Sequence, residues 1–473
     1  MNFNIKKAFS VLSACTLSAS ALAVFPAYAD ILNTKGKELH DGSFYYELKD
    51  NTYTITGLYA SIVTEIPSQS NGTAITAIAE GALAGCGGLK NLIIPDSITY
   101  IGDYAFAGCT GIQELTLPKR LEYLGDSAFR GCTGITSVKV PDSVTEINDY
   151  TFGNCDHMTS VDLPDTITSI GNGAFYECTS LETFRVPKDL KIIGTDAMGE
   201  WFSIKEIDAS ASSAFTVEND MLMDKDKTHV YRGLSTISGD LYIPETVSKV
   251  VGGAFSGCLG VTDLFVPLSV AEIDTNAFAF CSSLKSVDFS EGLAVIGDSA
   301  FCGDSSLVSV ELPTTLESIG TFAFGYCQGL EKVILNEGIK TIGEDAFLNC
   351  DNLKSMTIPN SVTEIGENAV GMEVAVTNEE SQFTAKKDFE LNGVSGSAAQ
   401  KYAKKNNISF KTTGGSLKQF AFIVIAIALV LAVIVFAVVL MSRSSKSADS
   451  GAKKAKKKAD EKAEEESYEK IVE

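Results

Sequence analysis

Histidine, tryptophan and basic residues are scarce in this chain, and this scarcity narrows what the protein can bind. Among 473 residues there are three histidines and one tryptophan, and 60 acidic side chains outnumber 38 basic ones, which gives a net charge of −22. Nucleic acids and anionic membrane surfaces repel a chain with this charge. We therefore expect no nucleic-acid partner.

The common motifs of catalysis are also missing. The patterns G-x-S-x-G, H-E-x-x-H and C-x-x-C and the phosphate-binding glycine loop do not occur in the sequence. His40, His157 and His229 lie far apart along the chain, and the carboxylates are too numerous for one pair to stand out. We predict a protein that is not an enzyme, with no catalytic residues, no cofactor and no bound metal.

The N-terminal residues have the pattern of a secretory signal peptide. A short basic region and an apolar run lead to the small-residue motif Ala27-Tyr28-Ala29. We predict that residues 1–29 are this signal and that cleavage falls between Ala29 and Asp30. An alternative stays open, because the residues that end at Cys15 resemble a lipobox, in which Cys15 would become a lipidated N-terminus.

A second apolar segment lies near the C-terminus. Phe420 to Met441 carries no charge and exceeds the ~20 residues that a helix needs to cross a bilayer. We predict a transmembrane helix over residues 417–441. The tail, residues 442–473, begins with basic residues, which is typical of the cytoplasmic side. The chain would then cross the plasma membrane (the cell membrane) once, with its large N-terminal part extracellular and its tail cytoplasmic.

Cysteine recurs at a fixed interval in the central part of the chain. Five cysteines follow one another at steps of 23 residues, namely Cys86, Cys109, Cys132, Cys155 and Cys178. Each unit reads L-x-x-L-x-L-P and then V-x-x-I-G-x-x-A-F-x-x-C. The alternating apolar positions predict a short strand with one buried face. Asp126 and Ser127 are suited to cap a short helical turn that carries Ala128 and Phe129.

A unit of this kind cannot bury its apolar face alone, so neighbouring units must stack. We predict a leucine-rich-repeat solenoid over residues 73–372, with a parallel β-sheet, short helical turns, a 23-residue period and about 12 coils. A β cap over residues 30–72 would cover its first coil. Residues 373–416 would form the C-terminal cap and linker.

One coil carries an irregular insertion at about residues 208–241. Its Asp220, Asp224 and Asp226 lack the spacing and the closing glutamate of a calcium hand, so we interpret them as turn residues.

The cysteines outside the signal peptide are even in number, which in an exported protein suggests disulfides. Residues in the same position of stacked coils, however, point in parallel and cannot turn toward each other without strain. We predict buried, reduced thiols. Cys302 lies outside the column and is the one candidate for an exposed cysteine.

The repeat unit resembles that of the BspA-like leucine-rich-repeat family of bacterial cell-surface proteins. The resemblance covers roughly Thr73 to Met372 and rests on many copies at one period. It implies a surface-exposed adhesin or binding protein that recognises an extracellular protein ligand or a neighbouring cell surface.

The outward middle position of each predicted strand forms a ladder along the sheet. The ladder consists of Ile93, Thr116, Lys139, Asp162, Arg185, Asp208, Phe265, Asp288, Glu311, Ile334 and Thr357. Its mixture of charged and apolar groups suits protein recognition, and a merely solvated face is the alternative. The candidate ligand-binding residues are Lys139, Asp162, Arg185, Asp208, Phe265, Asp288 and Glu311.

Three functions fit these features. The first is a membrane-anchored surface protein that mediates protein recognition or adhesion without catalysis. The second is a surface receptor that signals through its cytoplasmic tail, and the third is a passive structural component of the envelope.

Overall fold

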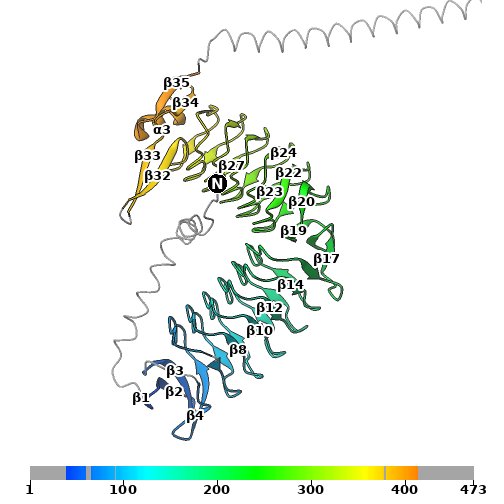
Figure 1. Ribbon diagram of the computed structural model, residues 1–473, viewed down its shortest axis with the longest axis vertical. Coiled ribbons are helices and arrows are strands. Elements are labelled where there is room, and N and C mark those ends of the chain that lie inside the picture. Colours follow the sequence, from blue (N-terminus) through cyan, green and yellow to red (C-terminus); the bar gives the residue numbers. More distant parts are fainter. Residues whose placement is uncertain (1–38, 60–64, 91, 378–379, 414–473) are drawn as a thin grey trace, which may run out of the picture. The chain divides into compact units, whose positions relative to one another are not determined.

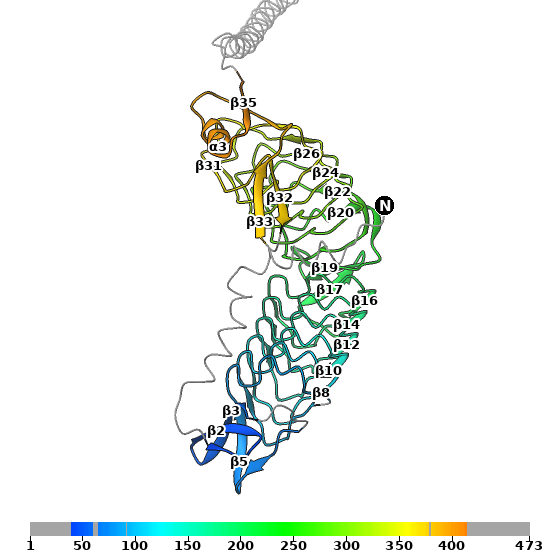
Figure 2. The same cartoon turned by 60° about the vertical axis from the view of Figure 1, so that its left-hand side comes forward.

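The computed structural model describes residues 39–59, 65–90, 92–377 and 380–413. Within these ranges the chain forms coil after coil, and most coils contribute one strand to each of two parallel rows (Figures 1 and 2). The predicted signal peptide, the predicted transmembrane segment 417–441 and the predicted tail lie outside the described residues.

The long-strand row carries the leucine strands of the repeat. It consists of β6 (Leu92–Ile93), β8 (Glu114–Thr116), β10 (Ser137–Lys139), β12 (Ser160–Asp162), β14 (Thr183–Arg185), β16 (Glu206–Asp208), β20 (Ser238–Tyr242), β22 (Gly260–Val266), β24 (Ser286–Phe289), β26 (Ser309–Glu311), β28 (Lys332–Ile334), β30 (Ser355–Thr357) and β34 (Glu390–Gly393). Within each sheet of this row neighbouring strands pair in parallel, as Val138 does with Val161 one repeat later.

The short-strand row lies on a second side of each coil. It consists of β3 (Thr52–Leu58), β5 (Thr73–Ile78), β7 (Tyr100–Ile101), β9 (Tyr123–Leu124), β11 (Glu146–Ile147), β13 (Ser169–Ile170), β15 (Ile192–Ile193), β19 (His229–Gly233), β21 (Lys249–Val250), β23 (Glu272–Ile273), β25 (Val295–Ile296), β27 (Ser318–Ile319), β29 (Thr341–Ile342) and β31 (Glu364–Ile365). Its parallel register again follows the repeat, with Ile147 opposite Ile170.

The Ala-Phe segments form a third side, which we call the turn row. Ala128 and Phe129 are fully buried there. The phenylalanine rings stack from coil to coil, with centroids 5.0 Å apart for Phe106 and Phe129 and 5.1 Å apart for Phe255 and Phe278. The repeat therefore builds its core from columns of identical side chains at close to the spacing of paired strands.

The turn row is not helical, which corrects the prediction of short helical turns. The N–H of Phe106 donates to the carbonyl of Ala128 in the next coil at 2.8 Å, and the N–H of Tyr104 donates to Asp126 at 2.8 Å. Tyr104 and Ser127 also have left-handed backbones, with φ of 56° and 55°. A left-handed residue in each turn interrupts an α-helix. Bonds to the next coil alternate with short bonds within the turn, such as that from the N–H of Ala107 to the carbonyl of Tyr104 at 3.0 Å.

The predicted number of coils is also corrected. The solenoid has about 15 turns and not about 12, because strands without an Ala-Phe turn, such as β3 and β34, also join the rows. No helix among the described residues is long and apolar enough to cross a membrane, and the α-helix α3 (Ala398–Asn406) has nine residues.

Antiparallel strands stand at both ends of the described stack. β1 (Leu39–His40) pairs with β2 (Phe44–Lys49), which pairs with β3, and β4 (Gln69–Ser70) pairs with β5. At the other end β32 (Met372–Thr377) and β33 (Glu380–Ala385) form a hairpin. The helix α3 follows β34, and β35 (Ser409–Thr412) then joins the sheet of β30 and β34.

The irregular insertion rejoins the stack through one of its own strands. β17 (Phe215–Glu218) pairs antiparallel with β18 (Met221–Asp224), β18 with β19, and β19 then pairs in parallel with β21. Fully buried Arg232 donates to the carbonyls of Trp201, Gly253 and Ser256 at 2.8, 2.8 and 3.1 Å. One guanidinium thus satisfies buried acceptors where the regular stacking is interrupted.

The cysteine column is buried, as predicted. Cys132 and Cys155 are free and fully buried, and each thiol donates to the carbonyl of the phenylalanine 26 residues earlier, at 3.1 and 3.4 Å. Cys86 at the start of the column is half-buried. Cys302, the candidate for exposure, is 1% exposed, so that suggestion is wrong.

Candidate functional site

The long-strand row holds the ladder that the sequence singled out. Six of the seven candidate residues are exposed, and Phe265 is half-buried. Because the strands pair one repeat apart, the ladder residues lie opposite one another, Lys139 beside Asp162 and Arg185 beside Asp208. Phe265 is opposite Asp288, and Glu311 is opposite Ile334.

The two basic ladder residues form ion pairs with neighbouring carboxylates. Lys139 Nζ lies 2.7 Å from Asp162 Oδ2. This hydrogen bond raises the pKa of Lys139. Arg185 turns to Asp165, at 2.7 Å between Nη1 and Oδ1, and also donates to the carbonyl of Leu163 at 2.6 Å. These exposed pairs contribute little to stability, but they reduce the positive charge that the ladder offers to a partner.

The acids of the ladder differ in their surroundings. Asp208 Oδ1 accepts the backbone N–H of Ser210 at 2.8 Å, and hydrogen bonding to Ser210 lowers the pKa of Asp208. Asp288 and Glu311 line a hollow of about 350 Å³, together with Glu291. The structure therefore brings two of the candidate acids into one concave, acidic part of the surface.

An exposed aromatic residue extends the ladder, and it was not among the residues predicted from the sequence. Tyr242 lies opposite Phe265 in the sheet, and the two rings stack with centroids 4.4 Å apart and planes 5° apart. Tyr242 is 61% exposed. Its position is one period before Phe265 and directly before an Ile-Pro pair that ends a repeat strand, so the 23-residue step could have identified it. The predicted insertion ends at residue 241, directly before Tyr242, and this obscured the repeat step from Tyr242 to Phe265.

A second aromatic pair lies on the short-strand row. Tyr100 and Tyr123 stack with centroids 4.7 Å apart, and both are exposed. The Tyr123 hydroxyl donates to Asp103 Oδ1 at 3.2 Å. Burial and the neighbouring carboxylate raise the pKa of Tyr123 to about 12.

In the part of the chain that the structure describes, no group of three or more histidine, cysteine, aspartate or glutamate side chains is placed to hold a metal ion. The ladder instead offers stacked rings, carboxylates and strand edges in a regular array.

Comparison with known proteins agrees with this architecture. The model of the BspA type leucine rich repeat region matches six copies, over residues 75–217, 229–309 and 248–373. No curated protein sequence matches the chain.

Two crystal structures show the same fold. A leucine rich cell surface protein from Faecalibacterium prausnitzii A2-165 is 27% identical, with a TM-score of 0.55 over 71% of this chain and 95% of that chain. The pneumococcal vaccine antigen PcpA is 17% identical, with a TM-score of 0.50 over 80% of this chain and 100% of that chain. With its repeat matched over more than half of its length, this chain belongs to the BspA-type leucine-rich-repeat family, a bacterial surface-type fold that generally serves protein–protein interaction.

Proposed function

We propose that this protein is a non-catalytic recognition module of the bacterial cell surface, which mediates adhesion by binding an extracellular protein ligand or a neighbouring cell. The long-strand row is the proposed binding surface. One observation supports the proposal most directly. The stacked rings of Tyr242 and Phe265 lie next to the acidic hollow, because Phe265 is opposite Asp288, which lines the hollow together with Glu311. The signal pattern that ends at Ala29 supports export, and the similar Faecalibacterium protein is a cell-surface protein.

The chemistry of this surface favours a protein partner. Aromatic side chains are enriched at the centres of protein interfaces, because a rigid ring buries a large area with little loss of conformational entropy. Tyr242 and Phe265 supply such a centre. The carboxylates of Asp288 and Glu311 beside them favour a partner with basic groups at its rim.

The experiment is a binding screen of the purified full chain against extracellular-matrix proteins, cell-wall glycans and intact cells at several salt concentrations. We expect a saturable protein ligand whose affinity falls at least about tenfold in Tyr242→Ala, the usual loss at an interface hot spot. Glu311→Gln should weaken binding at low salt more than at high salt. The matched control is Tyr100→Ala, which removes an exposed, stacked tyrosine from the other row and should leave the affinity unchanged.

Other outcomes would favour other functions. A passive envelope component would bind nothing in the screen at any salt concentration. A signalling receptor would bind its ligand normally after deletion of residues 442–473, but the cellular response would be lost. Equal losses in Tyr242→Ala and Tyr100→Ala would argue against the long-strand row as the binding surface.

A further inference from the structure

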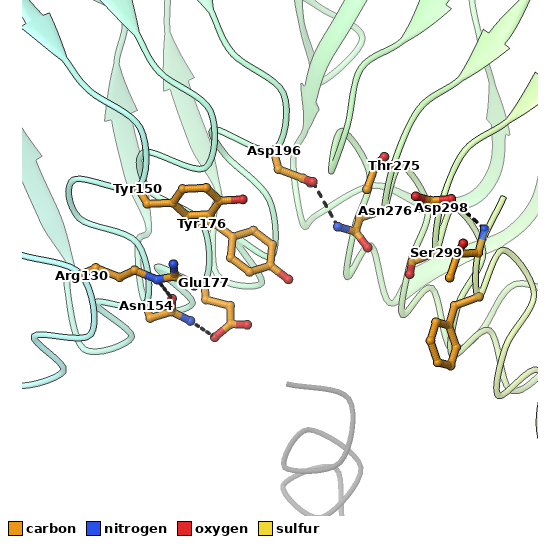
Figure 3. Close-up of a pocket in the computed structure, with 12 residues that line it drawn as sticks. Arg130, Tyr150, Asn154, Tyr176, Glu177, Asp196, Thr275, Asn276, Asp298 and Ser299 are labelled. Carbon is orange, nitrogen blue, oxygen red and sulfur yellow. Dashed lines mark hydrogen bonds between the residues drawn. The ribbon is translucent and has the colours of Figure 1, made fainter. Parts of the chain in front are cut away.

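A cavity of about 310 Å³ opens on the turn row, away from the ladder. It lies where the insertion interrupts the repeat. Tyr150 and Glu177 line it from coils before the insertion, and Asn276 and Asp298 line it from coils after the insertion. Asp196 stands between the two sets, and Figure 3 shows their side chains facing one another across the gap.

The backbone of the turns explains why these side chains gather in one place. Tyr150, Glu177, Asp196 and Asn276 have φ values of 53°, 56°, 54° and 55°. This left-handed conformation is uncommon for residues other than glycine, but the turn row repeats it in coil after coil. The cavity is therefore lined by side chains from two left-handed positions of the turns, brought together from both sides of the interruption.

Asp196 is the central acidic group of the cavity. It is 8% exposed. Its Oδ2 accepts from Asn276 Nδ2 at 3.1 Å, a bond between residues 80 positions apart, while its Oδ1 has no hydrogen-bond partner among the described residues. Burial raises the pKa of Asp196 to about 7, and the bond from Asn276 opposes this only in part. A buried carboxylate oxygen without a partner is costly and leaves an acceptor open to a ligand.

More negative charge surrounds Asp196. Glu177 accepts a hydrogen bond from Asn154 Nδ2, and burial raises its pKa. Behind them Glu200 is 4% exposed and accepts from the Tyr176 hydroxyl at 2.7 Å through Oε1, while its Oε2 has no partner among the described residues. Three carboxylates thus crowd one side of the cavity.

The two arginine side chains near the cavity make their hydrogen bonds to groups other than these carboxylates. Arg130 is the one basic residue among the described residues that line the cavity. Its guanidinium lies 4.8 Å from the centre of the Tyr150 ring, and its Nε donates to Asn154 Oδ1 at 3.4 Å. Arg232 donates from Nη1 and Nη2 to backbone carbonyls at the interruption, while its Nε has no hydrogen-bond partner among the described residues. The buried carboxylates therefore have no side-chain cation in direct contact within the described part of the chain.

The size and chemistry of the cavity indicate which class of ligand it can bind. Because the described residues include no group of three or more side chains that could hold a metal ion, a metal is disfavoured. The volume is at the low end for ligand sites, which suits one short chain with a charged end. Guanidinium and ammonium groups carry several N–H donors and no acceptor, which matches a cavity rich in acceptors.

We propose that this cavity binds an organic cation, a guanidinium or primary ammonium group on a short alkyl chain, with Asp196 Oδ1 as its main acceptor. Figure 3 shows the Tyr150 hydroxyl and the Asn276 carboxamide beside the same carboxylate, where they add polar contacts. The cation has two possible sources, a basic side chain of a protein partner or a free amine. The site is separate from the ladder, so it stands whether or not the ladder binds a protein.

The test uses the full chain and two probes at neutral pH. Nα-acetyl-arginine N-methylamide represents the basic side chain, and 1,4-diaminobutane represents the free amine. Binding is followed by calorimetry and by the fluorescence of Trp201, the single tryptophan, which directly follows Glu200. We expect saturable binding of at least one probe, and the probe that binds more tightly identifies the source. The neutral citrulline counterpart of the arginine probe should not bind.

Variants decide whether the binding is at this site. Asp196→Asn keeps the size of the side chain and should weaken the probe at least about tenfold, the effect of losing a charge-assisted hydrogen bond. Tyr150→Phe should weaken it by a smaller factor, and it serves as the second variant if Asp196→Asn folds poorly. The matched control is Asp142→Asn, at an exposed position, which should bind like the wild type. Failure of both probes to bind, or unchanged binding in Asp196→Asn and Tyr150→Phe, would overturn the proposal.

Discussion

The indole Nε1 of Trp201 donates a hydrogen bond of 2.9 Å to the carbonyl of Phe175. Trp201 occupies the position that cysteine holds in most other coils, and it keeps the bond that the cysteine thiols make, such as that of Cys178 to Phe152 at 3.3 Å. Most residues at this position of the repeat therefore place a buried hydrogen-bond donor against a carbonyl of the preceding coil. Cysteine is the most frequent of these residues.

This relationship predicts the effect of removing the indole donor. Trp201→Phe keeps an aromatic ring but loses the N–H and some volume, so we expect the free energy of unfolding to fall by about 2–3 kcal/mol. Denaturant unfolding followed by circular dichroism measures it. The control Tyr242→Phe removes an exposed hydroxyl and should change stability by less than about 0.5 kcal/mol. A loss no larger than that of the control would show that the bond to Phe175 is unimportant.

Asp304 occupies the same column but makes no such bond. It is fully buried, and neither carboxylate oxygen has a partner of good hydrogen-bond geometry among the described residues. Burial raises the pKa of Asp304 well above its usual range, which disfavours the charged form of this carboxyl in the folded protein. We expect Asp304→Cys to raise the free energy of unfolding by about 1–3 kcal/mol near neutral pH, because it restores the usual thiol and removes an unsatisfied acid.

The pH dependence gives this prediction a second readout. A carboxyl whose pKa is raised on folding stabilises the protein below its unfolded pKa, and that stability is lost as the pH rises. The melting temperature of Asp304→Cys should therefore exceed that of the wild type by more at pH 8 than at pH 5. A difference that shrinks with rising pH would contradict the assignment.

Asp196 should produce a similar trend over a defined range of pH. Its folded pKa is about 7, raised mainly by burial and further by Asp274, while the bond from Asn276 and the charge of Arg232 lower it. An unfolded aspartate releases its proton near pH ~3.9. The folded state thus binds more protons between about pH 4 and pH 7, and stability falls as the pH rises through this range.

The variant Asp196→Asn has no carboxyl group at this position, so it lacks this pH-dependent contribution to stability. Relative to the wild type, its melting temperature should rise as the pH increases from 4 to 8, and differential scanning calorimetry at several pH values measures this. The exposed control Asp142→Asn should show no such trend. Saturation with the cation that binds the cavity should reduce the difference at pH 8, because the ligand supplies the missing counter-charge.

The cysteines predict a pattern of chemical labelling. Cys86 is half-buried, whereas Cys109 and Cys132 are fully buried. Burial also raises the pKa of all three thiols, which keeps them in the less reactive protonated form. With a maleimide under native conditions, peptide mapping should find Cys86 modified first and the column modified only in denaturant. Rapid native labelling of Cys132 would contradict the packing described above.

The sequence was sufficient for the features that depend on the nearest repeats. The 23-residue step alone predicted the stacked coils, the buried Ala-Phe pairs such as Ala128-Phe129 and the buried cysteine column. These features follow from the sequence because each residue meets its equivalent one repeat away, so that a periodic pattern specifies the contact directly.

The tertiary structure decided what happens where the period is broken. The turns became left-handed rather than helical because their N–H groups bond to the next coil, a competition that local helix signals do not reveal. Tyr242 was found in the ladder only in the structure, where β20 pairs with β22 directly after the insertion, although the 23-residue step also leads from Tyr242 to Phe265. Asp196 met Asn276 because packing across the interruption joins coils that lie far apart in sequence, and no local pattern encodes that contact.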